Sequence, residues 1–242
     1  NKKYAIPLSI TGASNYSLIP SQRSAILLLN RSILSSVAKV SGGEGIRIKP
    51  VGMHTKAEWT IQMSAIYSSL TRSNLTTAYL SNGTGGEFYT RISSTAGIQV
   101  KNGRDGDDTW TQIPLQAGKW LHITYVHKDK KTTVYVNGKV QKVFENSAIT
   151  FGENSMIVVG NSGYRNDYLR EIRLWDKALT ESEINDYLYL PMDPATPHLI
   201  SYLPLSKEME TKDLKAPAGT ENVTTKARIE YVEKVKFPAD EL

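Results

Sequence analysis

Apolar and polar residues alternate with a period of two along much of the chain, as they do in β-strands that bury one face. In residues 59–66 the apolar positions are Trp59, Ile61, Met63 and Ala65, and polar residues stand between them. Similar short runs, bounded by glycine, proline and asparagine, predict strands throughout the sequence. The predicted strands are residues 4–10, 25–29, 46–48, 59–66, 78–80, 88–92, 97–100, 121–126, 132–136, 139–144, 156–159, 169–175, 199–205 and 229–232.

The strongest hairpin signal is Asn137-Gly138, which stands between the runs 132–136 and 139–144. Both central residues of a type I′ turn have positive φ, and Asn-Gly is a favoured pair there. We therefore expect an antiparallel meander that starts with residues 121–126 and continues through this hairpin.

One helix is expected, near residues 180–189. Thr180 and Glu183 have the spacing of a capping box, in which each side chain bonds the other residue's backbone N–H. Leu179 and Ile184 would add a hydrophobic staple across the cap. At least ten short strands with one peripheral helix predict an all-β fold, a sandwich or barrel of antiparallel sheets.

The composition excludes several classes of site. The chain has 242 residues, 40% of them hydrophobic, which suits one large all-β domain or two small ones. It contains no cysteine, so disulfides, thiolate metal sites and cysteine nucleophiles are excluded. No apolar run approaches the roughly 20 residues that a membrane helix needs, and no transmembrane segment is expected.

The formal net charge of +5 raises the question of nucleic-acid binding. Residues 1–56 hold eight of the 29 basic residues and one of the 24 acidic residues, so the excess lies near the N-terminus. These basic residues are spread singly among apolar ones, whereas a phosphate-binding surface clusters them or interleaves them with aromatic residues. We therefore expect no nucleic-acid partner.

Four motifs in a fixed order resemble the laminin-G-like domain of the concanavalin A-like lectin/glucanase superfamily. They are GKWLHIT (118–124), VYVNGK (134–139), REIRLWDKALT (170–180) and HLISYLPL (198–205). The last departs from the family pattern, because Leu203 stands where tryptophan is usual. The resemblance covers about residues 46–206 and implies an all-β, antiparallel jelly-roll β-sandwich with one short peripheral helix. It also implies glycan recognition.

The N-terminal strands resemble the end of a different domain. Residues 4–10 and 25–29 are similar to the final strands of the bacterial domain of unknown function 1735, which commonly precedes laminin-G-like or glycosidase domains in surface lipoproteins that handle glycans. The resemblance implies an extracellular or cell-surface location, as an outer-membrane lipoprotein after signal removal, with neighbouring domains of the parent protein as partners. The expected division is a truncated β-sandwich domain (1–31), a linker (32–45), the jelly roll (46–206) and a charged extension (207–242) that would add strands to the sandwich.

Catalytic residues are not expected. Retaining glycosidases place two carboxylates near 5 Å from each other, which alternate positions of one strand provide, and no such pair occurs here. Glu171 and Asp176 are the nearest strand carboxylates, and they fall on opposite faces; we expect Glu171 to pair with a neighbouring basic residue. The sequence also lacks metal-ligand spacing among its histidines and a Gly-x-Ser-x-Gly elbow. A glycoside hydrolase with an atypical site and a structural or adhesion module remain the alternatives to a carbohydrate-binding module.

Sugar binding calls for an exposed aromatic ring beside planar polar groups. Two loops, around residues 102–110 and 161–168, provide both, although aromatic residues in loops also cover the edges of cores. The candidate carbohydrate-binding residues, for an oligosaccharide or glycan partner, are Asn102, Trp110, Tyr164, Arg165, Asn166 and Asp167. The remaining tryptophans, Trp59, Trp120 and Trp175, are expected in the core because they stand in alternating strand patterns.

A calcium site is the one candidate metal site. Asp105, Asp107 and Asp108 form the densest acidic cluster, and oxygen-rich loops bind Ca²⁺. Their spacing lacks the order of an EF-hand, and a solvated hairpin turn is the favoured alternative. No other cofactor is expected.

Overall fold

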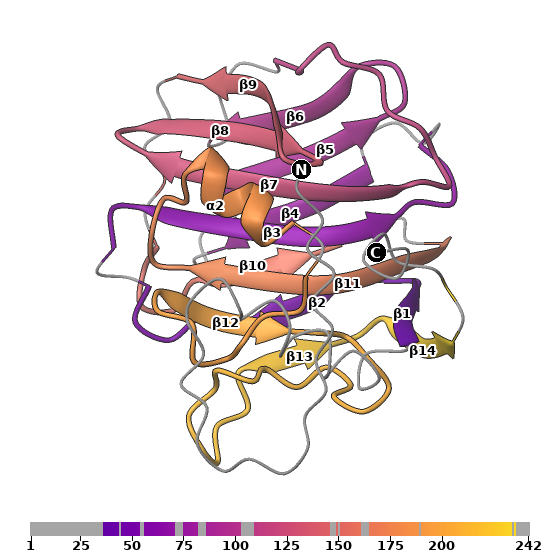
Figure 1. Ribbon diagram of the computed structural model, residues 1–242, viewed down its shortest axis with the longest axis vertical. Coiled ribbons are helices and arrows are strands. Elements are labelled where there is room, and N and C mark those ends of the chain that lie inside the picture. Colours follow the sequence, from indigo (N-terminus) through magenta and orange to yellow (C-terminus); the bar gives the residue numbers. More distant parts are fainter. Residues whose placement is uncertain are drawn as a thin grey trace, which may run out of the picture.

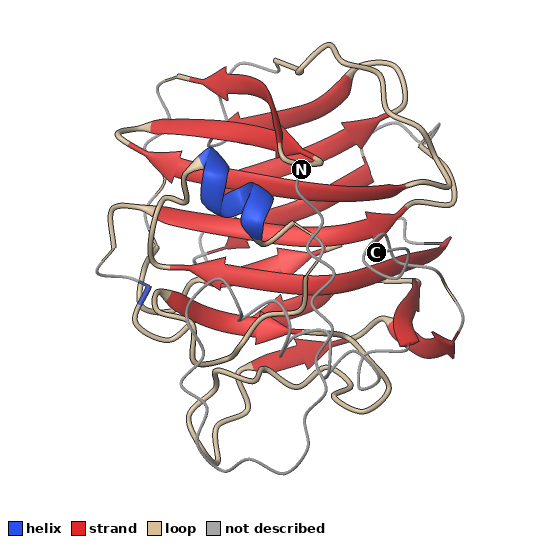
Figure 2. Ribbon diagram, in the orientation of Figure 1, coloured by secondary structure: helices blue, strands red, loops and turns tan. Residues whose placement is uncertain are grey.

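The computed structural model describes residues 36–43, 45–53, 56–70, 75–81, 86–102, 109–145, 149, 151–160, 165–188, 190–233 and 235. The chain is nearly all β, with two antiparallel sheets stacked face to face and one short helix on the outside (Figure 1; Figure 2). The predicted all-β sandwich is therefore confirmed. The predicted strands at residues 4–10 and 25–29, and with them the second resemblance, lie outside the described residues.

The larger sheet has eight strands. Its order is β14-β1-β11-β3-β7-β8-β9, and β12 also pairs with β11. The strands are β14 (Arg228–Glu233), β1 (Ser36–Ser41), β11 (Arg165–Trp175), β3 (Trp59–Ile66), β7 (Trp120–Lys128), β8 (Lys131–Val136), β9 (Lys139–Phe144) and β12 (Leu199–Leu203).

The smaller sheet has six strands in the order β13-β2-β10-β4-β5-β6. They are β13 (Val223–Thr225), β2 (Ile46–Ile48), β10 (Met156–Val159), β4 (Leu75–Ser81), β5 (Gly86–Ser93) and β6 (Gly97–Asn102). The chain passes repeatedly between the sheets, since β3, β7–β9 and β11 belong to the larger sheet and β4–β6 and β10 to the smaller one. Such crossing connections are typical of a jelly roll.

Aromatic side chains join the two sheets through the core. Trp59 of β3 is fully buried and meets Phe88 of β5 edge to face, with ring centroids 5.2 Å apart. Phe88 in turn meets Tyr125 of β7 at 5.5 Å, and the Tyr125 hydroxyl lies 2.7 Å from Thr77 Oγ1. The placement of Trp59 in the core is as predicted.

The outer face of the larger sheet is also buried, contrary to the half-exposed strand predicted for residues 59–66. Thr60, Gln62 and Ser64 of β3 are all 0% exposed. The helix α2 (Glu181–Asp186) and the chain around it lie across this face (Figure 1), and a second hydrophobic cluster forms beneath them around Trp175 and Ile184. Alternation in a strand cannot show that a later segment of the chain will cover its polar face.

The helix begins as predicted and ends early. Thr180 and Glu183 form the capping box with both reciprocal bonds present. The last helical residue is Asp186 rather than 189, and Tyr187 leaves the helical conformation at φ −101° and ψ 1°. The Tyr187 carbonyl accepts a hydrogen bond of 2.7 Å from the buried Arg173 guanidinium. This bond ties the end of the helix to β11.

The predicted hairpin has the expected turn. Asn137 and Gly138 have φ of 50° and 75°, as a type I′ turn requires. The turn is packed against the helix, because Asn185 Nδ2 donates to the Gly138 carbonyl at 3.2 Å.

Segments outside the expected jelly-roll limits complete both sheets. Ser36–Ser41, within the expected linker 32–45, forms β1 between β14 and β11. The stretch after residue 206 supplies β13 to the smaller sheet and β14 to the larger one. Asp213 fastens this stretch, since its carboxylate accepts hydrogen bonds from Ser201 Oγ (2.6 Å), the Tyr202 N–H (2.8 Å) and Asn222 Nδ2 (2.7 Å).

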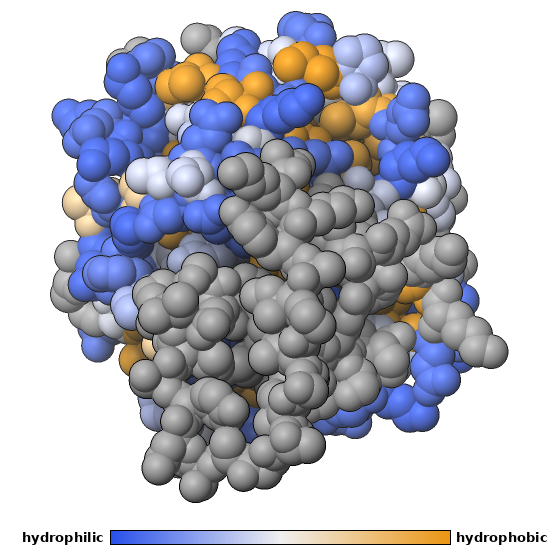
Figure 3. Space-filling model, in the orientation of Figure 1, coloured by the Kyte–Doolittle hydropathy of each residue, from blue (hydrophilic) through white to orange (hydrophobic). Residues whose placement is uncertain are grey.

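One edge of the larger sheet carries an exposed apolar strip. In the described chain β9 pairs only with β8, and its Val140 and Val143 are 45% and 42% exposed. Figure 3 shows apolar side chains gathered at this end of the face. Lys139 and Lys142 stand beside the valines on the same strand, and such charges disfavour edge-to-edge pairing with a second sheet.

Candidate functional site

The outer face of the smaller sheet is defined by the alternation within β5. Phe88, Thr90 and Ile92 are 0% exposed and point into the core, whereas Tyr89 and Arg91 between them are partly exposed. Successive side chains in a strand point to opposite faces, so Tyr89 and Arg91 lie on the outer face.

A row of side chains crosses five strands of this face. Tyr79 of β4 pairs with Tyr89, and Tyr89 pairs with Lys101 of β6. On the other side Tyr79 pairs with Val158 of β10, which pairs with Arg47 of β2. Paired residues share a face, and neighbouring strands lie about 4.8 Å apart, so the row from Arg47 to Lys101 is about 19 Å long.

A second, shorter row brings Trp110 onto the same face. Arg91 pairs with Gln99 of β6, and Gln99 forms an isolated bridge with Trp110. The Trp110 carbonyl also accepts a hydrogen bond of 2.9 Å from Lys142 Nζ of the larger sheet. This contact fixes Trp110 at the edge of the sandwich, and its side chain remains partly exposed.

The centre of the face is a stacked cation and ring. The Arg91 Cζ atom lies 4.8 Å from the centroid of the Tyr89 ring, within the range of a cation–π contact. Tyr79 lies on one side of this pair, and Gln99 and Trp110 lie on its other side. Aromatic rings beside a guanidinium can pack against the C–H faces of a sugar while the guanidinium donates hydrogen bonds to its hydroxyls. We call the set Arg47, Tyr79, Tyr89, Arg91, Lys101 and Trp110 the tyrosine–arginine face.

The described ends of the two predicted loops stand apart along β10. Asn102 ends β6 and pairs with Phe88 of β5. Phe88 pairs with Leu80 of β4, and Leu80 pairs with Ile157 near the start of β10. Arg165 follows the other end of β10, where the Gly160 N–H donates to the Thr77 carbonyl. The described residues that flank the two loops, Asn102 and Arg165, therefore lie toward opposite ends of β10.

The second loop is shorter than the sequence suggests. Arg165 and Asn166 already belong to β11, where Arg165 pairs with Ser41 of β1. Asp167 is 0% exposed, and its Oδ1 accepts a hydrogen bond of 2.6 Å from the Ser68 N–H. Tyr164 lies outside the described residues, as do the calcium candidates Asp105, Asp107 and Asp108. These residues stay predictions.

The sequence prediction included Trp110 and none of the other residues of the tyrosine–arginine face. The alternation of Tyr89 and Arg91 with buried neighbours is visible in the sequence, and it marks them as outward-facing. It does not reveal which strands lie side by side. Only the pairing of β4, β5 and β6 brings Tyr79, Tyr89 and Lys101 into one row.

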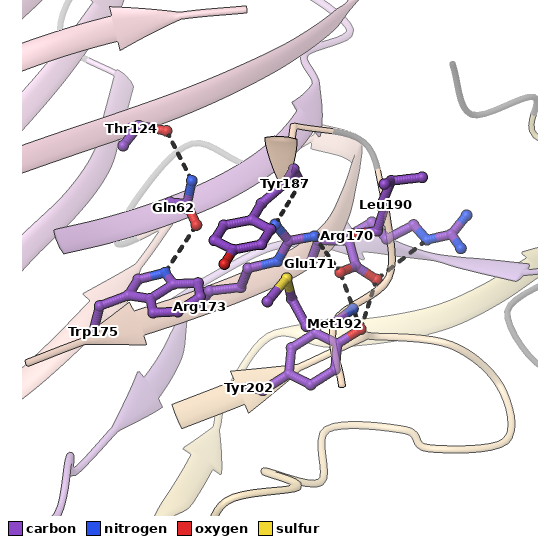
Figure 4. A network of polar contacts seen from close by, with 10 residues as sticks. All are labelled: Gln62, Thr124, Arg170, Glu171, Arg173, Trp175, Tyr187, Leu190, Met192 and Tyr202. Carbon is purple, nitrogen blue, oxygen red and sulfur yellow. Dashed lines mark hydrogen bonds and ion pairs between the residues drawn. The ribbon is translucent and has the colours of Figure 1, made fainter. Parts of the chain in front are cut away.

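Glu171 lies in a closed polar network on the opposite sheet (Figure 4). Arg173 Nη2 donates to Glu171 Oε2 at 2.7 Å, which confirms the predicted pairing with a neighbouring basic residue. The Tyr202 hydroxyl donates to the same carboxylate at 3.0 Å. Burial, and next the Glu171 charge, raise the pKa of Tyr202 well above its ordinary value. Glu171 and Arg173 are both 0% exposed, so this ion pair is closed off from solvent.

The three described histidines have separate surroundings. His122 is fully buried, and this burial, with the nearby Arg173 charge, lowers its pKa to about 3. His127 is stacked on Trp59 at a centroid distance of 5.0 Å. His198 Nδ1 lies 2.9 Å from Asp176 Oδ1. Within the described residues, no group of three or more His, Asp or Glu side chains is placed to hold a metal ion.

Comparison with protein families identifies the fold family. The family model described as the concanavalin A-like lectin/glucanases superfamily matches residues 41–185. This chain belongs to that family. No sequence among curated proteins matches it. Among the described residues, no helix is long and apolar enough to cross a membrane.

Several solved structures share the fold at low sequence identity. A provisionally assigned carbohydrate-binding protein from Bacteroides ovatus is 21% identical, with a TM-score of 0.65 over 85% of this chain and 62% of that one. The chain thus spans less than two thirds of that protein. Domain 4 of AbnA, a GH43 extracellular arabinanase of Geobacillus stearothermophilus solved with arabinotriose, is 20% identical, with a TM-score of 0.51 over 62% and 75% of the two chains. A heptameric SAP-like pentraxin of Limulus polyphemus is 13% identical, with a TM-score of 0.56 over 83% and 96%.

Proposed function

We propose that this chain is a non-catalytic carbohydrate-binding module that holds a glycan against the tyrosine–arginine face. The observation that carries the proposal is the arrangement of Tyr79 and Trp110 on either side of the stacked Tyr89–Arg91 pair. Partly exposed rings beside fixed hydrogen-bond donors are what a pyranose or furanose ring requires of a protein surface.

The shared fold is compatible with this role. The similar structures include a provisionally assigned carbohydrate-binding protein and an arabinanase domain solved with arabinotriose. We extend the proposal to the setting that the sequence suggests, which is an extracellular or cell-surface protein of bacterial glycan utilisation.

A binding role fits the described carboxylates better than a hydrolytic one. Glycosidases use two carboxyl groups about 5–10 Å apart on either side of the scissile bond. Glu171, the buried strand carboxylate, is sealed beneath the outer covering of the larger sheet.

The test is a screen of the purified full chain on an array of neutral and acidic glycans, followed by calorimetry with the best ligand. Tyr79→Ala and Trp110→Ala should each weaken binding at least tenfold while the thermal unfolding midpoint stays within a few degrees. Tyr135→Ala, which removes a partly exposed tyrosine from the larger sheet, is the matched control and should keep full affinity.

Two outcomes would contradict the proposal in different ways. A chain that binds no glycan on the array has another function. A chain that binds a glycan with unchanged affinity in both variants binds it elsewhere, and loss of binding in Tyr164→Ala would then place the site at the 161–168 loop.

A further inference from the structure

We propose that Lys142, on the edge strand of the larger sheet, is a positioning residue of the glycan site on the smaller sheet. It acts through Trp110, whose backbone it binds, and does not itself contact the glycan. The inference rests on the proposed function, because it requires the Trp110 ring to pack against the sugar. It goes further by making the affinity of a site on one sheet depend on a side chain of the other sheet.

A β-bulge turns Lys142 toward the smaller sheet. On β8, Tyr135 pairs with Val140 of β9. The next residue of β8, Val134, pairs with Lys142, so Gln141 is the extra residue of the bulge. Paired residues share a face, and Val134 is 0% exposed in the core between the sheets. Lys142 therefore lies on the inner face of the larger sheet, whereas without the extra residue it would lie on the outer face.

Two contacts fix the position of the Lys142 ammonium group. Its Nζ atom lies 5.2 Å from the centroid of the Phe144 ring, within the range of a cation–π contact, and Phe144 is 4% exposed. The same nitrogen donates a hydrogen bond of 2.9 Å to the Trp110 carbonyl. The ammonium group thus links the edge of β9 to the chain that lies beside β6.

The peptide group between Trp110 and Thr111 is bonded to both sheets. Its N–H, which belongs to Thr111, donates to the Ile98 carbonyl of β6 at 2.8 Å. Its C=O, which belongs to Trp110, accepts the hydrogen bond from Lys142 of β9. A trans peptide is planar and its N–H and C=O point in opposite directions, so the two bonds fix the rotation of this plane. Together with the bridge to Gln99, they restrict the backbone of Trp110 and hence the direction of its side chain.

The chain after Trp110 is bonded to β6 without the help of Lys142. Thr111 is 8% exposed, and its Oγ1 accepts a hydrogen bond of 3.0 Å from the Ile98 N–H. Loss of the ammonium group should therefore leave Thr111 docked on β6 and loosen Trp110 alone. A side chain that is ordered before the ligand arrives avoids the entropy cost of ordering on binding, an effect of about two- to tenfold in affinity.

The first experiment measures glycan affinity by calorimetry, with the full chain and the best ligand of the array. Lys142→Met keeps the length of the side chain and removes the donor, and it should weaken binding about fivefold. Lys142→Arg keeps a donor, and its affinity should stay within about twofold of that of the unchanged chain. Lys139→Met, which removes an exposed lysine from the same strand, is the matched control and should bind with full affinity.

A spectroscopic measurement follows Trp110 in the absence of glycan. Labelling with 5-fluorotryptophan gives one ¹⁹F resonance for each of the four tryptophans, and Trp110→Phe assigns one of them. In Lys142→Met the Trp110 resonance should shift or broaden, and in Lys142→Arg it should keep its place. The resonances of Trp59 and Trp175, which are 0% and 1% exposed, should not move in either variant. A role of Lys142 in overall stability alone would not single out Trp110.

The failure of this inference differs from that of the proposed function. Glycan binding that is lost in Trp110→Ala but unchanged in Lys142→Met overturns the inference and leaves the proposed function intact. An unchanged Trp110 resonance in Lys142→Met also overturns it, because the ammonium group then does not position the ring. Absence of binding to any glycan overturns both. If Lys142→Met lowers the unfolding midpoint, Lys142→Arg decides, since weak binding by an Arg variant with an unchanged midpoint overturns the inference.

Discussion

Replacing Arg173 should lower the free energy of unfolding more than any surface substitution does. Its guanidinium donates to Glu171 at 2.7 Å, to the Tyr187 carbonyl at 2.7 Å and to the Leu190 carbonyl at 2.5 Å (Figure 4). Arg173→Met keeps most of the side-chain volume and removes all three bonds. It leaves the buried Glu171 carboxylate with the Tyr202 hydroxyl and, at 3.7 Å, with the more distant Arg170 Nε.

The expected cost follows from the loss of one partner of a buried ion pair. Such losses destabilise proteins by about 3–5 kcal/mol, because a charge remains buried without compensation. For a chain of this size each kcal/mol lowers the unfolding midpoint by about 2–4 °C, so the midpoint should fall by roughly 6–20 °C. Arg170 is buried beside Glu171 and offsets part of this cost, which favours the lower half of the range.

Urea unfolding, followed by tryptophan fluorescence and circular dichroism, measures the change. The double variant Arg173→Met with Glu171→Leu should be more stable than Arg173→Met alone, because it removes the stranded charge. Lys131→Ala is the exposed control; it breaks an ion pair of 3.1 Å with Glu145 and should cost less than about 1 kcal/mol. A cost below 1 kcal/mol for Arg173→Met, or a double variant that is less stable than the single one, would refute this account of the network.

Three further predictions concern pH, the hairpin and the C-terminal stretch. The pKa of His122 is lowered from 6.5 to about 3, so between these pH values the unfolded chain binds a proton that the folded chain does not bind. The free energy of unfolding should therefore be highest above pH 6.5 and fall by up to about 1.4 kcal/mol per unit as the pH drops below it, and His122→Gln should flatten this slope between pH 7 and 5.5 in urea titrations. Gly138→Ala should lower the thermal unfolding midpoint more than Gly52→Ala does. Both glycines have φ near 75–78°, but an added Cβ at 138 would lie 2.1 Å from Asn185 Oδ1, whereas one at 52 meets nothing within 4 Å. Adding Asn185→Ala to Gly138→Ala should recover part of the difference in midpoint. Asp213→Ala should cost about 2 kcal/mol or more by leaving buried donors unbonded, and hydrogen exchange should quicken first in β13 and β14 if that carboxylate fastens them.

Local patterns predicted the elements whose causes are local. The Asn137-Gly138 turn and the Thr180–Glu183 capping box depend on residues a few positions apart, and both are present. Elements that depend on distant partners were missed or misjudged. Ser36–Ser41 forms a strand because β11 and β14 lie on either side of it, and nothing in its own sequence records those neighbours.

The same limit applies to the candidate site. Trp110 was selected from the sequence because it ends a polar loop, a local signal. Tyr79, Tyr89 and Lys101 come from three strands, and their alignment is a property of register rather than of any one segment. Loop residues such as Asp167 attract attention in a sequence, yet the strand pairing buries this carboxylate against the Ser68 N–H.

The two outer faces of the sandwich differ in what covers them, and this difference argues for the location of the site. On the larger sheet, Gln62 and His122 are 0% exposed, and Gln62 Oε1 is bonded to Trp175 Nε1 at 2.8 Å beneath α2 and its flanking chain. A ligand could reach that face only by displacing a packed helix and a buried ion pair. On the smaller sheet, Tyr79 and Arg91 remain partly exposed in the folded protein. The polar network and the capped helix therefore close the outer face of the larger sheet, whereas Tyr79, Tyr89 and Trp110 on the smaller sheet keep part of their surface exposed even though Val158 and Gln99 beside them are only 1% exposed.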